Sequence, residues 1–207
     1  VETIGEGAFE NCDQLTTLII GNGVETIENY AFQECSQLIT LIIGNGVETI
    51  GAAAFRYCSN VTSMDLGNVQ IIGDSAFYDC GQLTRVDIPN SVETIGPYAF
   101  YGTALTNVVI PNSVETIWNS AFENCNQLTN VTIGDNVKTI EFSAFKMCVS
   151  LASVDLGNVQ IIGEAAFKGC GLTSVDLGNV QTIGEQAFRN CGQLTRVDIP
   201  NSVETIG

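Results

Sequence analysis

The sequence predicts a repeat solenoid, in which short parallel strands stack turn upon turn around one continuous core. Three observations support this fold class. A valine recurs every 21 to 23 residues, an Ala-Phe pair follows each of the first nine valines at a fixed spacing, and each turn closes with an alternating segment such as Leu15-x-x-Leu18-x-Ile20. Such a period decides the architecture, because one turn buries its apolar residues only against its neighbours.

The repeats divide residues 1–207 into a single array without a second domain. We expect this array to be a fragment of a longer one, without its caps. A partial tenth repeat begins at Val203, and nine complete repeats begin at Val1, Val24, Val47, Val69, Val92, Val114, Val137, Val159 and Val180.

Each repeat contains four predicted elements. The Val-x-x-Ile segment is a short extended piece, and the Ala-Phe-x-x-Cys segment is a single helical turn that points Phe and Cys inward. The segment that ends the repeat alternates with period two and is a strand, so consecutive copies should stack as a parallel sheet at about 4.8 Å spacing. Gly-Asn or Pro-Asn then forms a corner. The short period excludes long helices.

The consensus Val-x-x-Ile-Gly-x-x-Ala-Phe-x-x-Cys-x-x-Leu-x-x-Val-x-Ile-Pro-x-Ser resembles the BspA-like class of leucine-rich repeats over the whole chain. The resemblance implies a right-handed leucine-rich-repeat superhelix and a cell-surface or secreted protein that takes part in adhesion. The sequence departs from the consensus at Thr103, where the cysteine is missing, and at Trp118, which replaces the usual glycine. The fold does not itself specify a ligand.

A second, longer period is also present. Residues 63–96 and 174–207 differ at six of 34 positions, and their offset is 174 − 63 = 111 residues, or five repeats. This likeness extends to positions that should face solvent, which indicates duplication of a whole block.

Charge restricts the partners that the chain can attract. It carries 23 acidic and 7 basic residues, for a formal net charge of −16. Nucleic acids and anionic membranes are therefore repelled, and a charged partner should be basic. No apolar run is long enough for membrane insertion in this segment.

The sequence argues against an enzyme. It contains no histidine, which excludes Ser-His-Asp and Cys-His arrangements. The Gly-Asn-Gly corners lack the lysine of a phosphate-binding loop. We expect no catalytic residue and no cofactor.

The eight cysteines allow three interpretations, which are disulfides, a metal site or free thiols. Neighbouring cysteines share one column, and their parallel side chains would hold the Cβ atoms farther apart than a relaxed disulfide prefers. A straight row also cannot surround zinc as a tetrahedron. We therefore expect buried free thiols.

Two columns of side chains should point outward from the strand that ends each repeat. They contain aspartates on adjacent strands, which either are tolerated in solvent or bind a basic ligand. A weak calcium site at Asp155, Asp176 and Asp198 is a further alternative, although the sequence indicates no other metal site. The ligand-binding residues we predict on this face are Arg85, Asp87, Asp155, Asp176, Arg196 and Asp198.

Aromatic residues occupy positions that are mostly polar or glycine in other repeats. Tyr98, Tyr101, Trp118 and Phe142 occur in three consecutive repeats. They form either an exposed patch for a protein or glycan or local packing around the missing cysteine.

These observations favour a non-catalytic, extracellular or cell-surface adhesion module that binds a protein or glycan through its parallel-sheet face, and a charged partner should be basic. The alternative is a structural stalk or filament with no ligand in this segment, which the block duplication supports. Uncapped ends would also permit head-to-tail self-association. A regulatory scaffold attached to an enzyme is the third interpretation.

Overall fold

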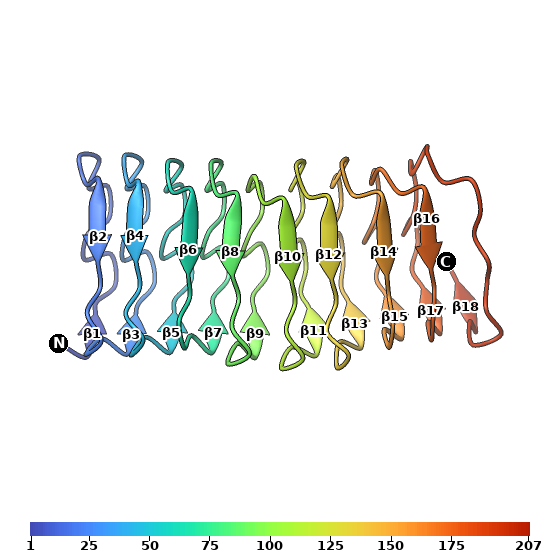
Figure 1. Cartoon of the computed structure of the whole chain (residues 1–207), viewed down its shortest axis with the longest axis horizontal. Coiled ribbons are helices and arrows are strands. Elements are labelled where there is room, and N and C mark those ends of the chain that lie inside the picture. Colours follow the sequence, from blue (N-terminus) through green and yellow to red (C-terminus); the bar gives the residue numbers. More distant parts are fainter.

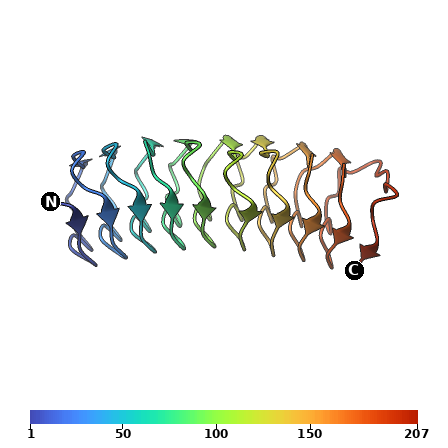
Figure 2. The ribbon, with the colours of Figure 1, turned by 90° about the horizontal axis from the view of Figure 1, so that it is seen from below.

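A computed structural model describes all 207 residues as a parallel β-solenoid of about nine turns. The turns stand side by side along one axis, and the two termini lie at opposite ends (Figure 1 and Figure 2). The structure contains strands and turns and no helix. Each turn has a main face, a minor face and a turn side, which the following paragraphs define.

The minor face consists of ten two-residue strands from the Val-x-x-Ile segments. They form two five-stranded parallel ladders, β1-β3-β5-β7-β9 and β11-β13-β15-β17-β18. Equivalent residues pair in register throughout, as Ile4 does with Ile27. The strands are β1 (Thr3–Ile4), β3 (Thr26–Ile27), β5 (Thr49–Ile50), β7 (Ile71–Ile72), β9 (Thr94–Ile95), β11 (Thr116–Ile117), β13 (Thr139–Ile140), β15 (Ile161–Ile162), β17 (Thr182–Ile183) and β18 (Thr205–Ile206).

The main face consists of eight three-residue strands from the segments that end the repeats. Their central residue points inward and the outer two point to solvent, as period-two alternation predicts. They pair as β2-β4, β6-β8, β10-β12 and β14-β16 rather than as one continuous sheet. The strands are β2 (Thr17–Ile19), β4 (Thr40–Ile42), β6 (Ser63–Asp65), β8 (Arg85–Asp87), β10 (Asn107–Val109), β12 (Asn130–Thr132), β14 (Ser153–Asp155) and β16 (Ser174–Asp176).

One core of 57 buried apolar residues runs the length of the array. Its largest members form a phenylalanine column, from Phe9 to Phe188, with adjacent ring centroids 5.2–5.5 Å apart and planes within 11° of parallel. Each inner ring therefore contacts the repeat before it and the repeat after it. This column binds the repeats into a single hydrophobic unit.

The turn side carries the Ala-Phe-x-x-Cys segments, and here the prediction of a helical turn is wrong. In the second repeat, Tyr30 and Glu34 have φ angles of 58° and 61°, in the left-handed region. The N–H groups of Tyr30, Phe32 and Glu34 donate to carbonyls of the next repeat instead of continuing a helix. The prediction that Phe and Cys point inward is confirmed, because Phe32 and Cys35 are buried.

All eight cysteines are free, as the sequence predicted. Seven thiols donate a hydrogen bond to the phenylalanine carbonyl of the preceding repeat, as Cys58 does to Phe32 at 3.2 Å. Thr103 takes the place of cysteine in the fifth repeat, and its hydroxyl lies 3.3 Å from the Cys125 sulfur. Burial raises the pKa of Cys80 and of Cys125 to about 12, so these thiols stay protonated and inert.

The ninth repeat is incomplete on the main face. Its counterpart of the other main-face strands, residues 195–199, forms no ladder, and the chain there bends away from β16 (Figure 1). The side chains of Val197 and Ile199 are 38% and 52% exposed. The chain rejoins the array at β18, in the partial tenth repeat, which pairs with β17.

Candidate interaction surface

The main face presents a mixed surface of charged, hydroxyl and apolar side chains. The last residue of each main-face strand points outward. This residue is Ile19, Ile42 or Val109 on three strands and aspartate on four others. These apolar side chains are 67%, 50% and 59% exposed. A surface of this composition is typical of protein interaction sites, which combine apolar contacts with a few charged groups.

Arg85 and Asp87, two of the predicted ligand-binding residues, form an ion pair along β8. The Arg85 Nη2 and Asp87 Oδ2 atoms lie 2.9 Å apart, and both side chains are exposed. The two residues point to the same side of the strand because they are two positions apart. An exposed pair of this kind adds little to stability, so both groups remain available to a partner.

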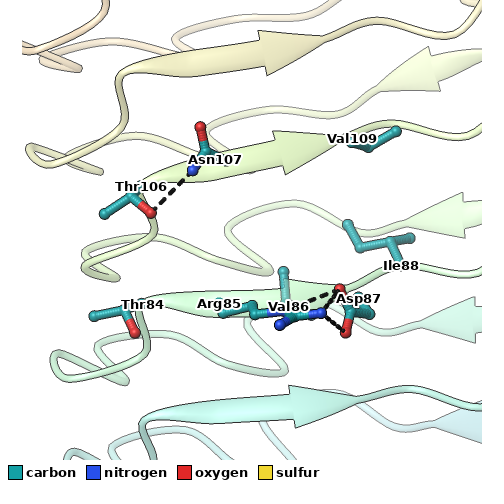
Figure 3. A pocket seen from close by; sticks show the side chains of 8 residues that line it. All are labelled: Thr84, Arg85, Val86, Asp87, Ile88, Thr106, Asn107 and Val109. Carbon is teal, nitrogen blue, oxygen red and sulfur yellow. Dashed lines mark hydrogen bonds and ion pairs between the residues drawn. The ribbon is translucent and has the colours of Figure 1, made fainter.

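A groove lies beside this ion pair, between β8 and β10 (Figure 3). No ladder joins these two strands, and the remaining backbone hydrogen bond here runs from Thr106 N–H to the Thr84 carbonyl at 3.2 Å. The groove has a volume of about 310 Å³. Its lining residues are Thr84, Arg85, Val86, Asp87, Ile88, Thr106, Asn107 and Val109.

The structure brings together only two of the three aspartates considered for calcium. Asp155 and Asp176 are paired neighbours on β14 and β16, whereas Asp198 lies in the segment that leaves the sheet and pairs with Arg196 at 2.9 Å. Asp155 and Asp176 each accept a hydrogen bond from the N–H group two residues later, at 2.9 Å. The expected row of three is therefore not formed, and no group of three or more acidic or cysteine side chains is placed to hold a metal ion.

The local sequence explains why these aspartates differ. Asp65, Asp155 and Asp176 precede Leu-Gly, and the glycine adopts a φ of 57°, 48° or 46° that turns its N–H group back to the carboxylate. Asp87 and Asp198 precede Ile-Pro and pair with arginine instead. The carboxylates of Asp65, Asp155 and Asp176 thus stabilise the turn that follows each strand.

The predicted aromatic patch divides into separate parts. Tyr98 and Tyr101 belong to a tyrosine cluster on the turn side, whose other members, Tyr57 and Tyr78, the sequence analysis missed. The Tyr78 and Tyr101 rings stack at 4.5 Å, and the Arg56 guanidinium lies 4.8 Å from the Tyr78 centroid. The missed residues could have been found, because they fall at equivalent or adjacent positions of consecutive repeats.

Contacts within the tyrosine cluster favour its packing role. Asn124 donates to the Tyr101 hydroxyl, and Arg56 donates to the Tyr57 hydroxyl. Burial, followed by the neighbouring Tyr101, raises the pKa of Tyr78 to about 12. Burial also raises the pKa of Asp79, against the effect of Arg56. The hydroxyls of Tyr57 and Tyr101 are thus paired within the protein, whereas the buried Arg56 Nε atom has no hydrogen-bond partner.

Trp118 and Phe142 lie outside this cluster. Both side chains are 42% exposed, and neither ring stacks on a tyrosine. Trp118 lines a groove on the minor face. Phe142 is held at the turn side by a backbone hydrogen bond from Ser120 N–H to its carbonyl.

These features define a repeat scaffold with open, solvent-facing grooves and no assembled catalytic group. The chain belongs to the BspA type Leucine rich repeat region family, which matches residues 1–104 and 93–207 with six copies. That family is a repeat scaffold rather than a catalytic family. No curated protein sequence gives a significant match.

Two solved bacterial structures are similar over most or all of the chain. The Treponema pallidum leucine-rich repeat protein TpLRR is 29% identical with a TM-score of 0.69, over 73% of this chain and 72% of its own. A leucine-rich cell surface protein from Faecalibacterium prausnitzii is 28% identical with a TM-score of 0.64, over 100% of this chain and 66% of its own. No helix in the present structure is long and apolar enough to cross a membrane.

Proposed function

We propose that this chain is a non-catalytic interaction module of a cell-surface protein, and that it binds a partner protein through the main face. The observation that carries the proposal is the groove between β8 and β10. There, the solvent-exposed ion pair of Arg85 and Asp87 and the side chain of Asn107 line the same groove. These groups can exchange their mutual contacts for contacts with a partner at little cost, because their ion pair is already solvated.

Three further observations support this function. A rigid array of parallel strands presents many side chains at fixed spacing without a change in the core. The similar protein from Faecalibacterium prausnitzii is described as a cell surface protein, which supports an extracellular location for this one. The net charge of −16 favours a partner with a basic surface.

Surface plasmon resonance against immobilised fibronectin, laminin, fibrinogen and collagen would test the proposal. We expect saturable binding to at least one of these proteins, which weakens as salt is raised because charged groups take part. The variant Arg85→Ala/Asp87→Ala should weaken that binding at least about tenfold, which corresponds to about 1.4 kcal/mol.

The chain itself offers a matched control. Arg196→Ala/Asp198→Ala removes the same pair from the same local sequence, but in a segment that forms no main-face strand. We expect this variant to bind like the unaltered chain. Equal losses from both double variants would instead indicate a nonspecific charge effect.

The structural stalk remains the second candidate, and the near-identical blocks 63–96 and 174–207 favour it. A stalk needs length and stiffness and no groove. Absence of binding to all the immobilised proteins by a folded, monomeric chain would support the stalk over the interaction module.

A further inference from the structure

The minor-face ladder is interrupted at one place, between β9 and β11. At every other junction, the N–H groups at the second, third and fifth positions of a repeat donate to the preceding repeat; Glu93, Thr94 and Gly96 do so to repeat four. The corresponding N–H groups of Glu115, Thr116 and Trp118 have no acceptor in the protein. Three donors are thus left free on one short stretch of backbone.

The residue at the fifth position accounts for this interruption. Gly51, Gly73 and Gly96 stand there in other repeats, and a Cβ atom added to any of them would lie 2.7 Å from an atom of the preceding repeat. Glu28 and Glu141 also occupy this position and keep their hydrogen bonds to the preceding repeat, so a Cβ atom alone does not open the ladder. The bulk of the indole ring distinguishes Trp118.

The interruption opens a groove of about 520 Å³ on the minor face. Five of its six lining residues are polar, and the sixth is the half-exposed Trp118. The carboxylates of Glu93 and Glu115 form no ion pair. The lining residues are Glu93, Thr94, Ser113, Glu115, Thr116 and Trp118.

We propose that this groove binds a neutral pyranose unit of a saccharide. The apolar C–H face of the sugar stacks on the Trp118 ring, since the ring offers a flat apolar surface next to polar groups. Sugar hydroxyls donate to the carboxylates of Glu93 and Glu115. The free backbone N–H groups and the threonine hydroxyls donate to oxygen atoms of the sugar.

The free N–H groups, together with the Glu93 carbonyl that has lost its donors, favour a sugar over a cationic side chain. An ammonium or guanidinium group satisfies the two carboxylates and lies over the indole ring, but it has donors and no acceptor. It therefore leaves the N–H groups of Glu115, Thr116 and Trp118 unpaired. A sugar hydroxyl both donates and accepts, so it satisfies both kinds of group. This site is separate from the main face and does not depend on the proposed function.

Trp118 is the only tryptophan in the chain, so fluorescence excited selectively at tryptophan, and not at the five tyrosines, reports on this groove. We would titrate the chain with the methyl glycosides of glucose, galactose, mannose and N-acetylglucosamine, and with pentalysine at physiological salt. We expect a saturable change of emission with at least one glycoside and none with pentalysine.

Calorimetry with the best glycoside would then compare variants, because it does not need the fluorophore. Trp118→Ala should weaken binding at least about tenfold, and Trp118→Phe should retain part of the affinity because a flat ring remains. Phe142→Ala is the matched control, since Phe142 is equally exposed in the next repeat and lies outside the groove. It should bind normally.

Three results would each overturn the proposal. The first is the absence of any saturable response to all four glycosides. The second is a saturable response to pentalysine, which would assign the groove to a basic partner. The third is sugar binding that survives Trp118→Ala or that falls equally in Phe142→Ala.

Discussion

Residues 63–96 and 174–207 are nearly identical in sequence but differ in structure. In the first block, Arg85, Val86 and Asp87 form β8, paired with β6. In the second block, Arg196, Val197 and Asp198 form no strand, and the chain after β16 bends away from the sheet (Figure 1). The side chain of Val86 is 7% exposed, whereas that of Val197 is 38% exposed. The local sequence is the same, so the neighbouring repeats decide whether the strand forms.

The ion pair behaves differently from the strand. The distance from the arginine Nη2 atom to the aspartate Oδ2 atom is 2.9 Å in both blocks. This contact joins residues two positions apart and needs no neighbouring repeat. Pairs of equivalent substitutions in the two blocks therefore separate contributions from the array and contributions from the local chain.

The largest difference should come from the phenylalanine column. Phe77 is fully buried between two rings, whereas Phe188 is half-buried and stacks on one ring only. Phe77→Ala should lower the free energy of unfolding by about 3–5 kcal/mol, and Phe188→Ala by roughly half as much because fewer contacts are lost. Urea unfolding followed by circular dichroism measures both. If Phe77→Ala does not fold, Phe77→Leu against Phe188→Leu gives the same comparison, and equal losses would contradict it.

The main-face valines should give the next largest difference. Val86→Ala removes two buried methyl groups and should cost about 2 kcal/mol. Val197→Ala should cost less than about 0.5 kcal/mol, since its side chain already contacts solvent. The same urea experiment applies. A loss at Val197 as large as that at Val86 would show that residues 195–199 join the sheet in solution.

The cysteines should differ in chemical reactivity. Burial raises the pKa of Cys80 to about 12 and that of Cys191 to about 11. Because Cys191 is less buried than Cys80 and its lower pKa leaves a larger thiolate fraction, Cys191 should react faster with iodoacetamide at about pH 8.5. Mass spectrometry of labelled peptides measures both rates, and labelling in urea, where the rates should converge, is the control.

The same pKa shifts give the array a defined pH dependence. Below about pH 9, both thiols are protonated in the folded and the unfolded chain, so they have no effect on stability. Above about pH 9, the unfolded chain releases the protons while the folded chain retains them, which favours unfolding. Stability should fall as pH rises through this range, by about 1.4 kcal/mol per pH unit for each buried thiol, and stability that is constant from pH 9 to 10.5 would contradict the shifts.

The smallest effect should come from the two arginines. Arg85→Ala and Arg196→Ala each break an exposed ion pair and should lower stability by less than about 1 kcal/mol. The two losses should agree within the error of urea unfolding, because the contact is local in both blocks. A larger loss for Arg85→Ala would mean that its pair supports the strands around the groove.

The sequence predicts the parts of the fold that repeat. The period, the inward phenylalanines and the free buried cysteines follow from apolar positions that recur in every turn. The helical turn was wrong although part of the signal was present, because the second left-handed position is glycine or asparagine in five repeats, at Asn11, Gly102, Asn124, Gly169 and Asn190. Residues such as Tyr30 and Glu34 at the same two positions of another repeat hid this signal. The sequence pattern alone did not reveal that their N–H groups bond to the next repeat.

The candidate sites are less predictable because they depend on contacts between repeats. Period two correctly places Arg85 and Asp87 on the outer surface, but it does not predict the groove beside them, since the ladder is also missing between β4 and β6 and between β12 and β14. Trp118 was visible as a departure from glycine, yet the free N–H groups next to it follow only from the hydrogen-bond pattern. Asp198 was misplaced because its strand was assumed to continue the sheet.

The phenylalanine column also determines how the chain responds to a pulling force along its axis. Each inner ring is held from two sides, so the loss of one repeat exposes a face of the next ring, and the repeats detach one after another under load. Each detached repeat releases 21 to 23 residues of chain, or roughly 70–80 Å of extended length at about 3.3–3.6 Å per residue. A protein that links a cell to a moving surface would then lengthen in steps and dissipate a sudden load before the attachment breaks.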